Sequence, residues 1–280
     1  MNTHWVNNLD PFLWRFPETW PLEGIRWYGV AYLMGFLVAW GLLYLYYKKG
    51  RSPLNPEAQS NLMTYLILGV LIGVRLGYVI LYAFTSWLSD PLLVFRVWEG
   101  GMASHGGFIG VILALWLFAR RNHMPFTALG DIAVTLVPPG LLFGRIANFI
   151  NGELWGKVSD VSWAIIFPKS APAGTPTELI PSRHPSQLYE GLLEGIVLFV
   201  LTQWLFWRRP QNAPARHGQI AGIFLIAYAL LRMIGECFRE PDAPLILGLS
   251  RGTFYSFFLI AMGIWLLWQA RKTDATKAPS

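Results

Sequence analysis

The chain has 280 residues, of which 54% are hydrophobic and 14% charged, whereas a soluble domain is about 25% charged. This composition excludes a disordered protein, a disulfide-linked secreted module and an ordinary cytosolic enzyme, because only lipid can cover so much apolar surface. The single cysteine, Cys237, excludes an internal disulfide, a CxxC zinc site and an iron–sulfur cluster.

Residues 1–28 lack a basic n-region and carry acidic side chains, so we predict an external amphipathic lead-in rather than a cleaved signal peptide. The stretches after it that are long enough to cross a bilayer, which needs about 20 residues, are 29–47, 62–83, 101–119, 128–150, 187–207, 219–238 and 253–270. The sequence therefore predicts an all-α integral membrane protein with seven transmembrane helices, forming a single domain over residues 1–280.

Basic clusters follow the first, third, fifth and seventh spans and therefore lie on one side of the membrane. They are Lys48, Lys49 and Arg51; Arg120 and Arg121; Arg208, Arg209 and Arg216; and Arg271, Lys272 and Lys277. Cytoplasmic loops carry such an excess, so the amino terminus is expected outside and the carboxyl terminus in the cytoplasm. The formal charge of +6 is thus a topology signal, and no nucleic-acid partner is expected.

The one long connection, 151–186, lies on the outer side and contains five prolines. It is expected to be an irregular periplasmic segment between spans four and five. Its regular spacing of prolines makes neither a helix nor a long strand favourable.

Span two contains Gly69, Gly73 and Gly77, a spacing that lets membrane helices approach closely, with Arg75 on another face. Arg75 either snorkels to the interface or binds a lipid headgroup. Span three begins with Ser104-His105 followed by Gly106-Gly107, where a substrate could approach the backbone.

Span four carries Pro138-Pro139 in its middle, which predicts a break or bend in the helix. At its outer end, Arg145 and Asn148 share a face and offer a cation and an amide to an anionic ligand.

Span six carries Tyr228, Arg232 and Glu236 on one helical stripe, with Arg239 one turn beyond. An intrahelical ion pair is the simple interpretation, but Arg145 lies at the same depth in another span. Charged side chains inside a membrane usually mark function, so two such arginines favour an anion site in the outer half of the bilayer. Planar guanidinium groups suit a lipid phosphodiester.

These residues resemble those of the bacterial prolipoprotein diacylglyceryl transferase family along nearly the whole chain. The similarity is carried by GRIANFINGELWG at 144–156, SHGGFIG at 104–110, RHPSQLYE at 183–190, RWYGV at 26–30 and the region of Tyr228, Arg232, Glu236 and FREPDA. The resemblance implies transfer of the diacylglyceryl group of phosphatidylglycerol to the lipobox cysteine in the signal sequence of a preprolipoprotein, with release of glycerol phosphate. It implies a bacterial inner (plasma) membrane, and neither a metal nor another cofactor.

The resemblance and the chemistry together assign expected roles to the site residues. Arg145 and Arg232 would bind the phosphate and leaving group, and His105 is the candidate general base. Tyr28, Asn148 and Asn151 would bind the glycerol or headgroup, while Glu153 and Glu236 would orient the arginines. Further expected substrate-binding residues are Arg75, Gly106, Gly107, Tyr228 and Arg239.

Two other classes of function remain open from the residues alone. A transporter or flippase of anionic lipids could use the same arginines, although the inner half of the spans lacks polar groups for a continuous path. An intramembrane hydrolase could use Ser104 and His105, but adjacency alone does not make a catalytic triad. Cys237 is expected to be a small apolar residue rather than a nucleophile.

Overall fold

The computed structural model describes residues 4–20, 22–96, 100–101, 103–210 and 216–275, with the backbone alone described for 104–105 and 273–275. The chain forms two compact units, one made of residues 40–132 and the other of residues 1–39 and 133–280.

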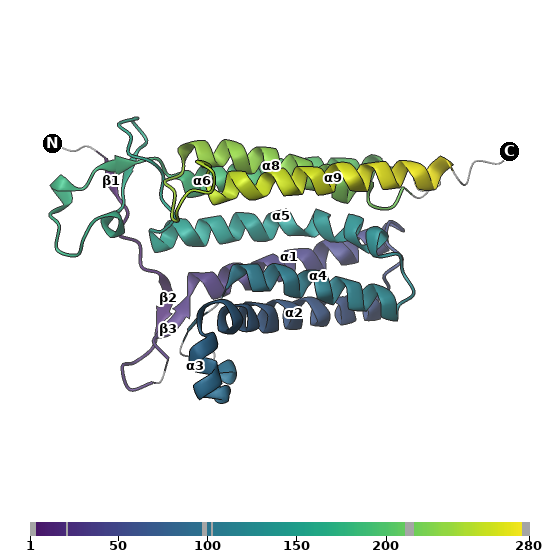
Figure 1. Cartoon of the computed structure of the whole chain (residues 1–280), viewed down its shortest axis with the longest axis horizontal. Helices are drawn as coiled ribbons and strands as arrows, with labels where there is room; N and C mark the ends of the chain where they lie inside the picture. Colours follow the sequence, from purple (N-terminus) through teal and green to yellow (C-terminus); the bar gives the residue numbers. More distant parts are fainter. Residues whose placement is uncertain (1–3, 21, 97–99, 102, 211–215, 276–280) are drawn as a thin grey trace. The chain divides into compact units, whose positions relative to one another are not determined.

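The chain is mostly helical, as the apolar runs predict (Figure 1). The helices are α1 Trp27–Lys48, α2 Pro56–Tyr82, α3 Phe84–Ser89, α4 Ser104–Arg121, α5 Phe126–Asn151, α6 Ser186–Glu190, the π-helical η5 Gly191–Val197, α7 Leu198–Arg208, α8 Gln219–Phe238 and α9 Arg251–Ala275, with a short 3-10 helix η1 Pro91–Phe95. The helices α8 and α9 lie side by side (Figure 1).

Six helical stretches are long and apolar enough to cross a membrane, namely α1, α2, α5, the continuous run Ser186–Arg208, α8 and α9. This confirms an all-α, multi-pass integral membrane protein. The predicted third span corresponds to α4, which has 18 residues and is not among the six candidates found in the described part of the chain. The seventh crossing therefore stays a prediction.

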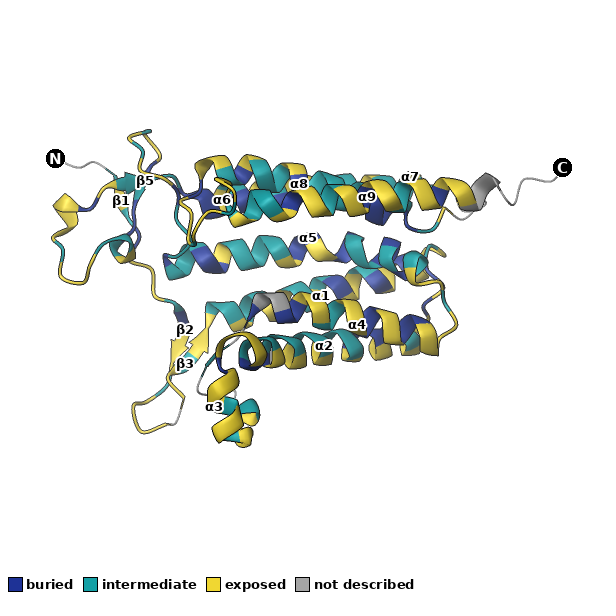
Figure 2. Cartoon of the chain, viewed as in Figure 1, coloured by how far each residue is buried: buried dark blue, intermediate teal, exposed yellow. Residues whose placement is uncertain are grey.

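The candidate spans differ in how much of their surface faces protein. In α5 and α8, 39% of the most apolar window is buried, against 17% in α1, α2 and α9. Figure 2 shows the difference, with α9 largely exposed and α5 mainly buried or intermediate. Because charged groups inside a membrane need protein partners, α5 and α8 are the helices best suited to hold them.

In the unit formed by residues 40–132, α2 and α4 pack with their backbones in close contact. A Cβ atom on Gly69 would lie 2.6 Å from the carbonyl oxygen of Gly110, and one on Gly77 would lie 2.7 Å from the Cα of Gly106. Real Cβ atoms do not come so close, so only glycine fits. The predicted close approach along this glycine run is confirmed.

The Gly73→Ala variant is expected to lose about 1–3 kcal/mol of folding free energy, because its Cβ would collide with the backbone of Gly106. The midpoint of thermal denaturation in detergent measures the loss. Gly41→Ala is the matched control, since a Cβ there meets no atom within 4 Å. Equal midpoints for the two variants would contradict the packing argument.

The prolines at 138 and 139 do not break α5, which continues through both. Of the two predicted outcomes, the break is absent and the bend stays a prediction, and the contacts explain how the helix continues. Proline 139 has no N–H to give to the carbonyl of Thr135, but Gln203 Nε2 of α7 donates to that oxygen at 3.1 Å. A side chain from the next span thus replaces one lost helical hydrogen bond.

The lead-in and the segment 151–186 contribute strands to two small sheets. The strands β1 Trp5–Val6, β4 Ile165–Ile166 and β5 Ser182–Arg183 form one sheet, and β2 Phe12–Arg15 pairs with β3 Gly24–Arg26 in another. The rest of 151–186 is irregular, as predicted, with the 3-10 turns η3 Pro168–Ser170 and η4 Thr177–Leu179.

Two contacts secure the lead-in. The side-chain amide of Asn7 donates to the carbonyl of Phe149 at 2.6 Å and so attaches the lead-in to the end of α5. In the β2–β3 hairpin, the Arg15 guanidinium hydrogen-bonds the carboxylate of Asp10 and lowers the pKa of that carboxyl group.

Candidate functional site

Arg145 of α5 faces two buried carboxylates from the run that follows segment 151–186. Its Nη1 lies 2.9 Å from Glu190 Oε2, an ion pair without hydrogen-bond alignment, and its Nη2 donates to Glu194 Oε2 at 3.0 Å. Neither glutamate side chain has any exposed surface, and 14% of the Arg145 side chain is exposed. Buried ion pairs therefore connect two spans in the protein interior.

Arg232 of α8 reaches the same two carboxylates from a third span. Its Nη1 donates to Glu190 Oε1 at 2.8 Å and to Glu194 Oε1 at 3.2 Å, and its Nη2 donates to Glu236. Arg239, just after α8, adds a contact of 3.3 Å to Glu190. We call Arg145, Glu190, Glu194, Arg232, Glu236 and Arg239 the arginine–glutamate cluster.

The local backbone brings these side chains together. Glu190 ends α6, and Glu194 lies in the π-helical η5, a rare geometry that often occurs at functional sites. Gly195 lets η5 approach α5 closely, because a Cβ there would lie 2.7 Å from the Cβ of Leu142. Gly235 likewise lets α8 approach the end of α6, because a Cβ there would lie 3.1 Å from the Cγ of Glu190.

The cluster is close to electrically neutral, since its members are three arginines and three glutamates. Buried charges are tolerated when each is paired, whereas an unpaired one is costly. The sequence predicts that Glu236 orients Arg232, and this contact is present. Glu190 and Glu194 are additional carboxylate partners of both arginines. Each guanidinium has five N–H groups, however, and the two carboxylate contacts of Arg145 use one each. The remaining N–H groups are rigidly oriented donors.

A second group of side chains lies at the outer end of α5. The hydroxyl of Tyr28, on α1, donates to Glu153 Oε1 and accepts from Asn148 Nδ2. The same Glu153 oxygen lies 3.2 Å from Asn148 Nδ2 and 3.5 Å from Asn151 Nδ2. We call these four residues the tyrosine–glutamate cluster. Its carboxylate is also anchored through the backbone, because Gln187 Nε2 donates to the Glu153 carbonyl at 2.6 Å.

The Tyr28→Phe variant should lower catalytic turnover about tenfold, since one hydroxyl serves both Glu153 and Asn148 and its loss leaves partly unsatisfied polar groups. Turnover and thermal midpoint should be measured on the same sample. The control is Tyr32→Phe one turn along α1, where 58% of the residue is exposed. Equal turnover in the two variants would remove Tyr28 from the site.

The structure brings together most of the residues predicted for the site. Arg145, Arg232, Glu236 and Arg239 meet in one cluster, and Tyr28, Asn148, Asn151 and Glu153 meet in the other. Glu236 contacts an arginine as expected, whereas the contacts of Glu153 run to Tyr28 and the two asparagines. Tyr228 lies on the predicted stripe of α8 with its ring stacked on Phe224.

The remaining predicted residues belong to the unit 40–132. The backbone of Gly106 is packed against Gly77, and a Cβ on Gly107 would lie 2.9 Å from a methyl group of Val74. These contacts give both glycines a helix-packing role, and their predicted part in substrate binding stays a prediction. The side chain of His105 lies outside what the structure describes, so its predicted role is untested.

Arg75 is buried, with 4% of its surface exposed, so it does not snorkel. Its guanidinium donates to five backbone carbonyls, those of Leu93, Val94, Arg96, Gly100 and Gly101. An arginine has five N–H groups, so none is left for a headgroup in this arrangement. The contacts give Arg75 a structural role beside η1 and Gly100-Gly101, and its predicted headgroup binding stays a prediction.

Sequence reasoning missed Glu190 and Glu194 as members of the site. Each is fully buried and contacts both Arg145 and Arg232. A signal was present, because acidic side chains within an apolar span need cationic partners at the same depth. Arg145 and Arg232 were the available cations in neighbouring spans.

The helices and the two polar clusters define a multi-pass membrane protein with a preorganised, ion-paired site in its interior. The profile of the prolipoprotein diacylglyceryl transferase family matches residues 17–269. This chain belongs to that family.

Curated relatives are similar over nearly their whole length, and each is named phosphatidylglycerol–prolipoprotein diacylglyceryl transferase. The protein of Idiomarina loihiensis is 43% identical over 277 residues, which cover 97% of each chain. That of Pseudoalteromonas atlantica is 44% identical over 272 residues, covering 94% of this chain and 90% of the relative. That of Ruegeria pomeroyi is 42% identical over 272 residues, covering 90% and 92%.

Proposed function

We propose that this protein is an enzyme of lipoprotein biogenesis that transfers the diacylglyceryl group of phosphatidylglycerol to a cysteine thiol of a prolipoprotein. The observation that carries the site assignment is the convergence of Arg145 and Arg232 on the same two buried carboxylates. Family membership supports the reaction, and the convergence supports a binding place for its phosphate.

In the reaction, the thiolate sulfur attacks the glycerol carbon that bears the phosphate. A C–S bond forms, the C–O bond to the phosphate breaks, and the electron pair leaves with glycerol phosphate. The thiol proton goes first to a base, for which His105 is the candidate, and then to the solvent or the leaving phosphate. A free thiol has a pKa near 8.5, so a base or a positive field must raise the thiolate fraction.

The arginine–glutamate cluster stabilises the departing phosphate, whose charge grows from one towards two. Donors that are already oriented bind such developing charge without reorganising. The carboxylates of Glu190 and Glu194 hold both guanidinium groups at the same place, because each carboxylate contacts both arginines. Glu236 orients Arg232 from the same helix.

The tyrosine–glutamate cluster binds the glycerol headgroup. Asn151 Oδ1 is a buried acceptor without a hydrogen-bond partner among the described residues, and a headgroup hydroxyl would supply the missing donor. Glu153 and Asn148 offer further acceptor and donor groups beside it. Tyr228 and Arg239 complete the binding region on α8 and just beyond it.

The finer topology follows the charge pattern. We place the protein in the bacterial inner membrane as one domain with seven spans, α4 included, the amino terminus outside and the carboxyl terminus in the cytoplasm. Arg145 and Arg232 then lie towards the periplasmic leaflet. The thiol acceptor is the lipobox cysteine of the signal sequence, which reaches the site from within the bilayer.

The direct test uses purified protein, phosphatidylglycerol and a lipobox peptide, with mass spectrometry of the peptide. A diacylglyceryl mass gain on the cysteine supports the transferase. An unchanged peptide together with lipid movement between leaflets would select the transporter or flippase of anionic lipids. A control peptide with serine in place of the cysteine should gain no mass.

The His105→Gln variant should lower turnover about 100-fold and remove the acidic limb of the pH–rate profile. The limb arises because a histidine base works only when neutral, and histidine ordinarily titrates near pH 6.5. His4→Gln, in the lead-in, is the control and should keep the wild-type profile. An acidic limb that persists in His105→Gln would exclude this histidine as the base.

A further inference from the structure

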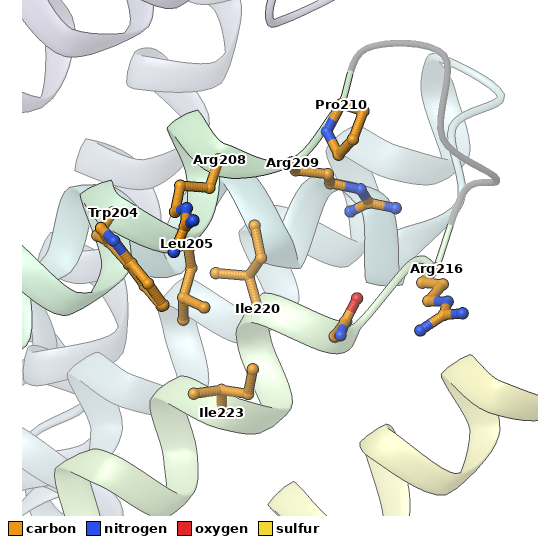
Figure 3. A pocket seen from close by; sticks show the side chains of 9 residues that line it. Trp204, Leu205, Arg208, Arg209, Pro210, Arg216, Ile220 and Ile223 are labelled. Atoms are coloured by element: carbon orange, nitrogen blue, oxygen red, sulfur yellow. The ribbon is translucent and has the colours of Figure 1, made fainter.

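A hollow of about 430 Å³ lies where α7 ends and α8 begins, and the proposed reaction does not use it (Figure 3). Ile220, in the first turn of α8, lines it, whereas Arg232 of the arginine–glutamate cluster lies 12 residues further along the same helix. At 1.5 Å per residue, the separation is about 18 Å. The hollow is therefore a separate site.

The walls of the hollow combine cations with apolar surface. Arg208 and Arg209 at the end of α7 and Arg216 just before α8 are its basic residues, and Leu205 and Ile223 contribute apolar side chains. In Figure 3, Arg209 extends from the end of α7 and Arg216 from the stretch just before α8. Both also interact elsewhere in the chain, so the argument rests on their charge and position.

Trp204 gives the hollow the character of a membrane interface. It is half exposed, and the Arg208 guanidinium lies 4.9 Å from the centroid of its ring. Tryptophan is enriched where hydrocarbon meets headgroups, because its ring is apolar and its N–H is polar. The pair thus marks the depth at which a lipid phosphate would lie.

The backbone adds a weaker attraction for an anion. The helix α8 begins after Gly218, which has a φ of 92° and provides no side-chain cap. The amino-terminal end of a helix carries a partial positive charge, and the first turn of α8 borders the hollow. Three guanidinium groups and a helix end therefore favour negative charge at the same place.

We propose that this hollow binds the phosphate of an anionic phospholipid, with the acyl chains lying along the apolar side chains of α7 and α8. The phosphate alone could come from free inorganic phosphate, but Trp204, Leu205 and Ile223 offer it nothing. The site faces the leaflet opposite to the proposed catalytic one, because the basic cluster follows the fifth predicted span. The proposal of a lipid site depends on the insertion of α7 and α8 into the membrane and does not depend on the transferase reaction.

The test counts lipids retained by the purified full-length protein in native mass spectrometry. Phosphatidylserine is the anionic probe, and phosphatidylcholine, with the same phosphate but no net charge, is the neutral one. The hollow variant is Arg208→Gln/Arg209→Gln/Arg216→Gln. We expect its dissociation constant for one phosphatidylserine to rise at least about tenfold, since each basic residue near a surface contributes to anionic lipid binding.

A matched variant removes equal charge from the same predicted membrane face. In Lys48→Gln/Arg120→Gln/Arg121→Gln, Arg120 also lies over a tryptophan, with 5.1 Å between its guanidinium and the Trp116 ring centroid. None of the three substituted residues lines the hollow. This variant should bind phosphatidylserine with a dissociation constant less than about threefold above wild type.

Three results would overturn the proposal. They are an equal loss in both variants, equal retention of phosphatidylcholine and phosphatidylserine by the wild type, and displacement of the lipid by millimolar inorganic phosphate. Peptide lipidation measured on the same samples reports whether each variant is folded. If the triple variant does not fold, Arg208→Gln alone serves, because that side chain is exposed, and an unchanged dissociation constant there would also overturn the proposal.

Discussion

The Glu190→Gln variant is expected to lose about 3–5 kcal/mol of folding free energy, which is the usual penalty for breaking a buried ion pair. This carboxylate has no exposed surface and contacts Arg145, Arg232 and Arg239 at 2.9, 2.8 and 3.3 Å. Glutamine removes the negative charge and leaves one excess cation in the interior. The thermal midpoint and the peptide-lipidation rate should both fall sharply.

Two further variants test the cause of that loss. Glu240→Gln is the control, because its side chain is 47% exposed and its one arginine, Arg183, is 3.4 Å away. We expect that control to change the folding free energy by less than about 0.5 kcal/mol. Adding Arg239→Gln to Glu190→Gln restores the charge balance and should recover part of the stability. A double variant less stable than Glu190→Gln alone would contradict the charge argument.

The Arg232→Lys variant is expected to lower turnover about 1,000-fold, the upper range for removing an oriented transition-state donor. Arginine contacts Glu190, Glu194 and Glu236 at once, whereas a lysine ammonium is a point charge that cannot span them. Steady-state peptide lipidation at saturating phosphatidylglycerol measures the loss. Turnover should fall more than the affinity for phosphatidylglycerol, because the guanidinium donors stabilise the charge that develops on the phosphate in the transition state.

Arg183→Lys provides the comparison for Arg232→Lys. Its side chain is equally buried, with 13% exposed, but it faces a single carboxylate at 3.4 Å. Turnover in that variant should stay within about threefold of wild type, because an ion pair to a half-exposed carboxylate contributes little. Near-wild-type turnover in Arg232→Lys would remove Arg232 from the phosphate site.

The helices could be predicted from sequence because long apolar runs leave few alternatives in a membrane. The stripe of Arg232 and Glu236 followed from helical spacing, and their ion pair is present. The glycine run of α2 also correctly predicted that this helix packs closely against another, which is α4. These features depend on one helix and its period.

Features that depend on a partner far along the chain were missed. The break predicted at Pro138-Pro139 is absent because Gln203, 68 residues from Thr135, binds the carbonyl freed by the second proline. The five carbonyls around Arg75 come from the short 3-10 helix η1, from Arg96 just after it and from Gly100 and Gly101. The glutamate partners of Arg145 lie 45 and 49 residues away, beyond any local pattern.

The most direct measurement is an experimental structure of the protein with phosphatidylglycerol bound. The account predicts one phosphate with oxygens about 3 Å from guanidinium nitrogens of both Arg145 and Arg232, and headgroup hydroxyls beside Asn151 and Glu153. A phosphate bound elsewhere, with both guanidinium groups still held by Glu190 and Glu194 alone, would contradict it.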